Sequence, residues 1–113
     1  MTSDLFAERF AAVRQRFAAK LEARIDEIEA AVPELGRGDG METLARAHRR
    51  AHDLCGVGPT MGFVATGKAA RTIEQVMLAA IKANRPLTGE EVDFVSGGVA
   101  QLRSAAPRAS PRS

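Results

Sequence analysis

Apolar residues recur at intervals of three and four along most of this chain of 113 residues, and that spacing places them on one face of an α-helix. The first and longest apolar stripe ends at Pro33 and a run of glycines, and it comprises Phe6, Phe10, Val13, Phe17, Leu21, Ile25, Ile28 and Val32. A helix of this length would span about 40 Å, more than the diameter of a small domain. We therefore expect a bend or a short separate N-terminal helix, although no helix-breaking residue marks its position. The phenylalanines of this stripe are expected to lie in the core.

A second and a third stripe of the same period follow. Asp39 and Gly40 offer a cap for the second helix, which should stop within the range 56–58, where two glycines occur. Pro59 disfavours helical geometry at the residue before it and suits the first turn of a new helix. The third helix is therefore predicted to begin at Pro59 and to end before Asn84.

Thr88 and Glu91 have the spacing of a capping box, in which each side chain accepts a hydrogen bond from the backbone of the other residue. This pair precedes a fourth stripe, which predicts a fourth helix weakened by two adjacent glycines. Four amphipathic segments joined by short loops predict an all-α protein, an antiparallel four-helix bundle with an N-terminal helical extension, over residues 1–105. Residues 106–113 carry proline and serine without apolar periodicity and are expected to form a disordered tail.

Composition and charge argue against several classes of protein. The net charge is +2, the charges are well mixed along the chain, and Trp and Tyr are absent, so nucleic-acid binding is not indicated. No stretch approaches the roughly 20 apolar residues of a membrane span, and the N-terminus lacks the apolar run of a signal peptide. The single cysteine, Cys55, cannot form an internal disulfide, which fits a reducing cytoplasm. We expect a soluble, cytoplasmic protein, and a monomer because nothing in the sequence requires a dimer.

The most informative feature is His52, which is followed by one glycine four residues later and another ten residues later. On a helix, the fourth residue lies one turn along the same face, so Gly56 would leave bare backbone beside the His52 ring. Glycine inside a helix costs about 1 kcal/mol relative to alanine, so its presence calls for a reason. Close approach of another molecule to an exposed imidazole is such a reason.

A carboxylate on the third helix would complete this site. Glu74 is the candidate, because the third helix is expected to run back alongside the second. If Glu74 accepts the proton of Nδ1, the Nε2 atom of His52 is left free to attack a phosphoryl group. Arg49, Lys68 and Arg71 are the nearby basic residues that would offset the negative charge of the phosphate.

Residues 51–74 resemble the signature of histidine-containing phosphotransfer (HPt) domains. The matching positions are Ala51, His52, Leu54, Gly56, Val57, Gly58, Gly62 and Glu74. The resemblance implies that His52 carries phosphate on Nε2 and that Glu74 orients its ring, the roles that the spacing had already suggested. It also implies an antiparallel four-helix bundle preceded by an N-terminal helix, in which Gly62 is a helix-packing glycine.

The resemblance further implies the activity of a component of a bacterial two-component phosphorelay. Such a protein takes a phosphoryl group from the aspartate of a receiver domain and passes it to the aspartate of another, so its partners are response-regulator receiver domains and a hybrid sensor kinase. We expect no cofactor on this chain, because Mg²⁺ is expected on the partner receiver domain. We also expect no kinase activity, since the chain shows neither a glycine loop that cradles phosphate nor an ATP-lid motif.

Receiver docking is expected on the exposed face around His52. The residues predicted on this face are Leu44, Ala45, His48, Arg49, Gly56, Val57, Met61 and Lys68. One position departs from the family pattern, because Cys55 stands three residues after the histidine, where the family usually has lysine. The phosphate therefore loses its usual cation, and Cys55 itself is expected to pack as a small apolar residue.

Two other functions stay open at this point. A helical interaction module could be inert or could bind a receiver without carrying phosphate, which the loss of the family lysine makes conceivable. A metal-binding bundle is the second, because His48, His52 and Cys55 fall on one helix face and are ligand types that zinc accepts. Three ligands on one helix are geometrically awkward, and the chain has no further His or Cys, so no metal site is predicted.

Overall fold

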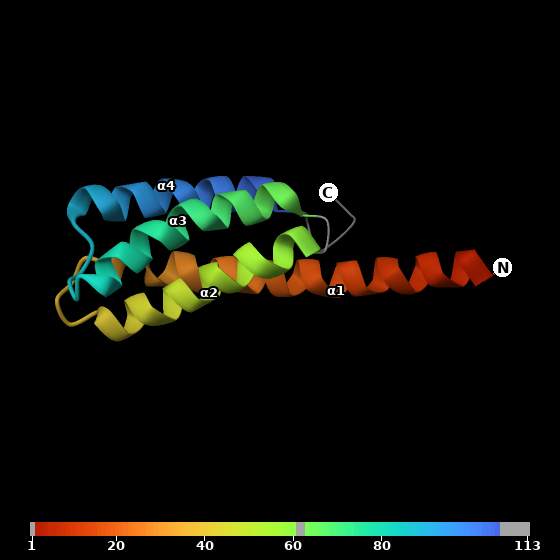
Figure 1. Ribbon diagram of the computed structural model, residues 1–113, viewed down its shortest axis with the longest axis horizontal. Helices are drawn as coiled ribbons and strands as arrows, with labels where there is room; N and C mark the ends of the chain where they lie inside the picture. Colours follow the sequence, from red (N-terminus) through yellow and green to blue (C-terminus); the bar gives the residue numbers. More distant parts are fainter. Residues whose placement is uncertain (1, 61–62, 107–113) are drawn as a thin grey trace.

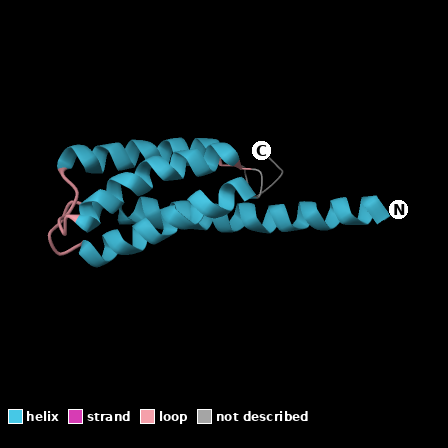
Figure 2. Cartoon of the chain, in the orientation of Figure 1, coloured by secondary structure: helices cyan, strands magenta, loops and turns pink. Residues whose placement is uncertain are grey.

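The structure is a computed structural model that describes the backbone of residues 2–60 and 63–106 and the side chains of residues 4–56 and 63–106. Within these residues, four α-helices and one short 3₁₀ turn follow one another (Figure 1), namely α1 (Thr2–Ala31), η1 (Val32–Glu34), α2 (Met41–Thr60), α3 (Val64–Lys82) and α4 (Gly89–Ala105). Figure 2 shows helices and loops, and no strand, over the described part of the chain. The predicted all-α fold is therefore confirmed.

Successive helices run in opposite directions and form an antiparallel bundle (Figure 1). α2 packs against α3, α3 packs against α4, and α1 closes the bundle by packing against both α2 and α4. The fully or almost fully buried large side chains come from all four helices and from two connecting segments, and they include Leu21, Ile25, Ile28, Leu35, Leu44, Leu54, Ile73, Met77, Leu87, Val95, Val99 and Leu102. Burying one such side chain stabilises the folded state by about 1.5–3 kcal/mol. The 3.6-residue period read from the sequence thus describes the real core.

The first helix is one uninterrupted element, and its N-terminal part projects beyond the ends of the other three helices (Figure 1). The bend or separate N-terminal helix expected from its length does not occur in the described residues. The expectation that its phenylalanines lie in the core is wrong for Phe6 and Phe10, which are 71% and 48% exposed. The reason is that the apolar stripe of α1 is longer than the bundle that covers it. Further along, Phe17 does reach the bundle and stacks on Phe63, with ring centroids 5.4 Å apart.

The predicted boundary between the second and third helices is wrong. α2 continues through Gly56 and Pro59 to Thr60, and α3 begins only at Val64. Once a helix has been nucleated and packed, each further residue adds a hydrogen bond for little extra ordering, so a glycine that costs about 1 kcal/mol does not end it. Pro59 falls in the last turn of α2, where the missing N–H removes one hydrogen bond to the carbonyl four residues earlier and almost no helix follows. Its assignment to the start of the third helix is therefore corrected.

The predicted end of α3 and start of α4 are confirmed. Asn84 adopts a left-handed conformation with φ of 54°. Its N–H donates to the carbonyl of Ile81 at 2.9 Å, and the N–H of Arg85 donates to the carbonyl of Ala80 at 3.0 Å, which is the hydrogen-bond pattern of a Schellman motif. The α4 capping box is present, with its reciprocal hydrogen bonds at 3.1 Å and 2.9 Å.

Gly98 explains how α4 lies so close to α3. A Cβ atom on Gly98 would collide with the Cγ2 atom of Ile73 on α3, whereas a Cβ atom on the adjacent Gly97 would meet nothing within 4 Å in the part of the chain that the structure describes. Gly98 is therefore a packing glycine, and the cost that it imposes on the helix is offset by the close approach of the two backbones.

None of the described helices is long and apolar enough to cross a membrane.

Candidate functional site

His52 lies on the exposed side of α2. The buried face of this helix is set by four apolar residues, Leu44, Ala47, Ala51 and Leu54, and His52 falls outside that stripe, with 70% of its side chain exposed. One turn later, Gly56 is also exposed, and an added Cβ there would meet no neighbouring atom within 4 Å among the described residues. A collision with another described side chain therefore does not explain the glycine at this position.

Glu74 projects from α3 toward both histidines of α2, and its side chain is only 13% exposed. The structure brings it to this face, as the sequence predicts, but its hydrogen bond goes to the other histidine. Oε2 of Glu74 lies 2.8 Å from Nε2 of His48 and 3.7 Å from Nδ1 of His52. The first distance is a hydrogen bond, and the second is too long for one but well within electrostatic reach.

The two histidine rings lie one above the other on α2, with centroids 6.0 Å apart and planes inclined by 22°. His48 is the more shielded of the two, with 18% of its side chain exposed. The sequence interpretation placed His48 on the docking face and missed it as the partner of Glu74. The signal was present, because residues four apart on a helix share a face, so a carboxylate that reaches one ring also reaches the other.

Cys55 is half-buried and packs against the hydrophobic core, as predicted. Burial raises the pKa of its thiol, and the nearby Glu74 carboxylate raises it further, with Arg71 acting in the opposite direction. The thiol is therefore neutral at pH 7 and supplies no charge where the family pattern has lysine. Among the described residues, no three His, Cys, Asp or Glu side chains are arranged to hold a metal ion, so the zinc hypothesis gains no support.

The three predicted phosphate neighbours lie in different places. Arg71 is exposed on α3 and is close enough to influence Cys55 electrostatically, which puts it on the histidine face. Arg49 is exposed on α2, one turn before His52. The structure corrects the prediction for Lys68, whose side chain lines a groove of about 300 Å³ on the other side of α3, together with Ala65, Ala69, Thr72, Gln101 and Ala105.

Among the predicted docking residues, His48 and Ala45 are half-buried and Gly56 is exposed. The prediction for Leu44 is wrong, because its side chain is completely buried in the core stripe of α2 and offers no surface to a partner. The side chain of Val57 and the whole of Met61 and Gly62 lie outside the described residues.

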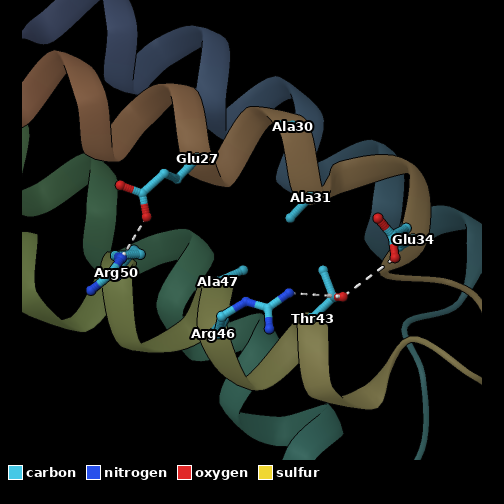
Figure 3. A pocket seen from close by; sticks show the side chains of 8 residues that line it. All are labelled: Glu27, Ala30, Ala31, Glu34, Thr43, Arg46, Ala47 and Arg50. Carbon is cyan, nitrogen blue, oxygen red and sulfur yellow. Dashed lines mark hydrogen bonds and ion pairs between the residues drawn. The ribbon is translucent and has the colours of Figure 1, made fainter.

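A second hollow of about 280 Å³ lies between α1 and α2 (Figure 3). Its polar side chains mostly satisfy one another. Arg50 donates to Glu27 at 2.7 Å, a contact that lowers the pKa of Glu27, and the Thr43 hydroxyl donates to Glu34 at 3.3 Å. Figure 3 shows these pairs bridging the hollow, so it serves as a polar seam between the two helices.

The comparisons with known proteins agree with this geometry. A family model described as "Hpt domain" matches residues 12–105, a span that contains both histidines, Glu74, and all of the bundle except the projecting first turns of α1. No curated protein and no solved structure gives a match. Since the matched span covers most of the chain, this protein belongs to the Hpt domain family, whose members have phosphotransfer-type functions in phosphorelays.

Proposed function

We propose that this protein shuttles a phosphoryl group between the aspartates of receiver domains and carries it on Nε2 of His52. The observation that carries the proposal is the orientation of the His52 ring. Its Nδ1 atom is the ring nitrogen near Glu74, at 3.7 Å, while 70% of the side chain is exposed. A proton on Nδ1 would face a carboxylate, and Nε2 would then be the unprotonated, nucleophilic atom that an incoming phosphoryl group meets.

The chemistry is a reversible displacement at phosphorus. The lone pair of His52 Nε2 forms the new N–P bond as the P–O bond of the aspartyl phosphate breaks, and the receiver's carboxylate leaves with the electron pair of that bond. The proton stays on Nδ1, where the negative charge of Glu74 stabilises the positive charge that develops on the ring. Transfer to the next receiver reverses these steps on a second aspartate.

The receiver domain supplies most of the charge that the transfer needs. We propose that Mg²⁺ is bound by the partner and that this chain contributes position more than charge, because Cys55 is neutral where the family has lysine. Arg71, and Arg49 from the other side of His52, are the cations of this chain that would face the phosphate. Response-regulator receivers and a hybrid sensor kinase are the partners, and we place the protein in the cytoplasm as a monomer.

The test is incubation of the chain with a receiver domain that carries radioactive phosphate. We expect acid-labile, base-stable label on the natural chain and none on His52→Ala. The matched control is His48→Gln, which removes the other histidine and should keep the label. Label that persists in His52→Ala would overturn the assignment, and receiver binding without any label on the natural chain would favour the interaction-module alternative.

A further inference from the structure

One carboxylate oxygen is shared by the two histidines of this chain. Oε2 of Glu74 is hydrogen-bonded to Nε2 of His48 at 2.8 Å and lies 3.7 Å from Nδ1 of His52. An ionised carboxylate only accepts hydrogen bonds, so the proton of neutral His48 must sit on its Nε2. An oxygen of a carboxylate has two lone pairs, so the bond from His48 leaves one for the N–H of His52.

The contact between His48 and Glu74 is the anchored half of this arrangement. Their side chains are 18% and 13% exposed, whereas that of His52 is 70% exposed. A hydrogen bond shielded from water is stronger than an exposed one, and the bond between His48 and Glu74 is shielded. His52 is too far from the carboxylate to hold it. The position of the Glu74 carboxylate is therefore set by His48.

Without the hydrogen bond to His48, the Glu74 side chain would not be ordered enough to orient the His52 ring. Its three rotatable bonds give it many conformations, and ordering it costs free energy that a contact of 3.7 Å does not return. The ring of His48 is also stacked beside that of His52, with centroids 6.0 Å apart.

We propose that His48 is a positioning residue for phosphotransfer. It holds the Glu74 carboxylate where it favours the tautomer of His52 with the proton on Nδ1, and so keeps Nε2 free as the nucleophile. The consequence for transfer rests on the proposed function, but the tautomer itself is measurable without any phosphate.

The test uses ¹⁵N NMR of the full chain, recorded across a pH titration, with the tautomers read where the ring signals of both histidines no longer change with rising pH. The chain has two histidines, so two sets of ring signals are expected. In the natural protein, His48 should carry its proton on Nε2 and His52 on Nδ1. If His48 carries its proton on Nδ1 instead, it cannot donate to Glu74 and the proposal is overturned without recourse to any variant.

Two substitutions separate positioning from packing. His48→Leu keeps bulk but removes the donor, and should shift His52 toward a mixture of both tautomers. His48→Gln places an amide N–H₂ within reach of Glu74 and should restore the Nδ1–H form. Glu74→Gln should change the tautomer ratio of His52 as His48→Leu does. The double variant His48→Leu with Glu74→Gln should change that ratio no further, because both substitutions act through the Glu74 carboxylate. An unchanged His52 spectrum in folded His48→Leu would show that His48 only packs.

Phosphotransfer gives the second readout. His48→Leu should accept phosphate about fivefold more slowly than the natural chain, the effect of losing one hydrogen bond, and His48→Gln should recover most of that rate. If the natural chain accepts no phosphate at all, the proposed function fails while the tautomer data still decide the role of His48. If transfer is normal in His48→Leu although its tautomer has shifted, positioning by His48 does not matter to the reaction and the proposal is overturned.

Discussion

Two helical glycines of this bundle, Gly56 in α2 and Gly98 in α4, lie in opposite surroundings. A side chain on Gly98 would collide with Ile73, whereas a Cβ on Gly56 would meet no atom of the described residues within 4 Å. The intrinsic cost to the helix is the same at both positions, about 1 kcal/mol relative to alanine. At Gly98 that cost is offset inside the molecule by the close packing of α3 and α4. At Gly56 no such collision with the described residues explains the missing side chain, and we infer that the glycine serves access from outside.

Two adjacent residues of α3 show the same contrast between internal packing and the exposed histidine face. Ile73 is completely buried and faces Gly98, while Glu74 faces the histidines of α2. Helix α3 therefore joins a packed interface to the histidine face. Its packed side fixes the backbone from which Glu74 projects, and the hydrogen bond to His48 then holds the carboxylate. The lesson is that a functional side chain is positioned by the burial of its sequence neighbours as much as by its own contacts.

The largest effect is expected where packing is the reason for glycine. Gly98→Leu should lower the free energy of unfolding by about 3 kcal/mol, because the new side chain has no room beside Ile73. The adjacent Gly97→Leu is the matched control, since that position is exposed and open. It should be neutral or slightly stabilising in the same denaturant titration. Equal stability of the two variants would abolish the distinction between a packing glycine and an access glycine.

A smaller effect, on function alone, is expected where access is the reason. Gly56→Gln should slow phosphoryl acceptance by about tenfold or more, because the side chain stands where the receiver must approach His52. Its free energy of unfolding should stay the same or rise by up to about 1 kcal/mol. Gly56→Ala is the control, with a similar gain in stability and transfer close to normal. Acceptance of phosphate by Gly56→Gln at the natural rate would show that the open surface is not used.

The smallest effect is on stability and concerns a charged residue at the start of α4, which is not part of the histidine face. A two-pronged ion pair with Arg85, at 2.8 Å and 3.1 Å, and the hydrogen bond from the Thr88 backbone lower the pKa of Glu91 to about 2. Because the folded-state pKa lies below the unfolded value, this carboxylate stabilises the protein at neutral pH, and the contribution is lost as pH falls from about 5 toward 2.

Glu91→Gln should therefore be less stable than the natural chain at pH 7 by no more than about 1 kcal/mol, because solvent reaches both side chains of the pair and screens their charges. The difference should shrink as the pH of the unfolding titration is lowered through that window. Phosphotransfer at pH 7 should be unaffected. A difference that grows toward acid pH would mean that the carboxylate is not held in its ionised form by Arg85.

Local signals in the sequence predicted much of this fold. The apolar period located the core, the spacing of Thr88 and Glu91 predicted a capping box that is present, and Asn84 marked the end of α3 because its left-handed conformation closes that helix. Each of these signals depends on residues within a few positions of one another, so the sequence alone carries it.

The features that sequence missed depend on contacts between distant residues. The exposure of Phe6 follows from α1 being longer than the helices that cover it, and no pattern within α1 shows that. Glu74 was placed on the correct face, but its choice of His48 over His52 rests on a difference of 0.9 Å between two contacts, from 2.8 Å to 3.7 Å. Helical spacing alone cannot resolve such a difference, because side chains four residues apart share one face.

The most direct test of the central claim is to locate the phosphorus atom itself. After phosphorylation of the ¹⁵N-labelled chain by a receiver domain, NMR correlation of phosphorus with the ring atoms identifies both the histidine and the nitrogen that carries it. We predict one phosphorylated species, with phosphorus on Nε2 of His52 and the proton retained on Nδ1. Phosphorus on His48, or on Nδ1 of His52, would contradict the account, because both outcomes require the Glu74 carboxylate to stand elsewhere.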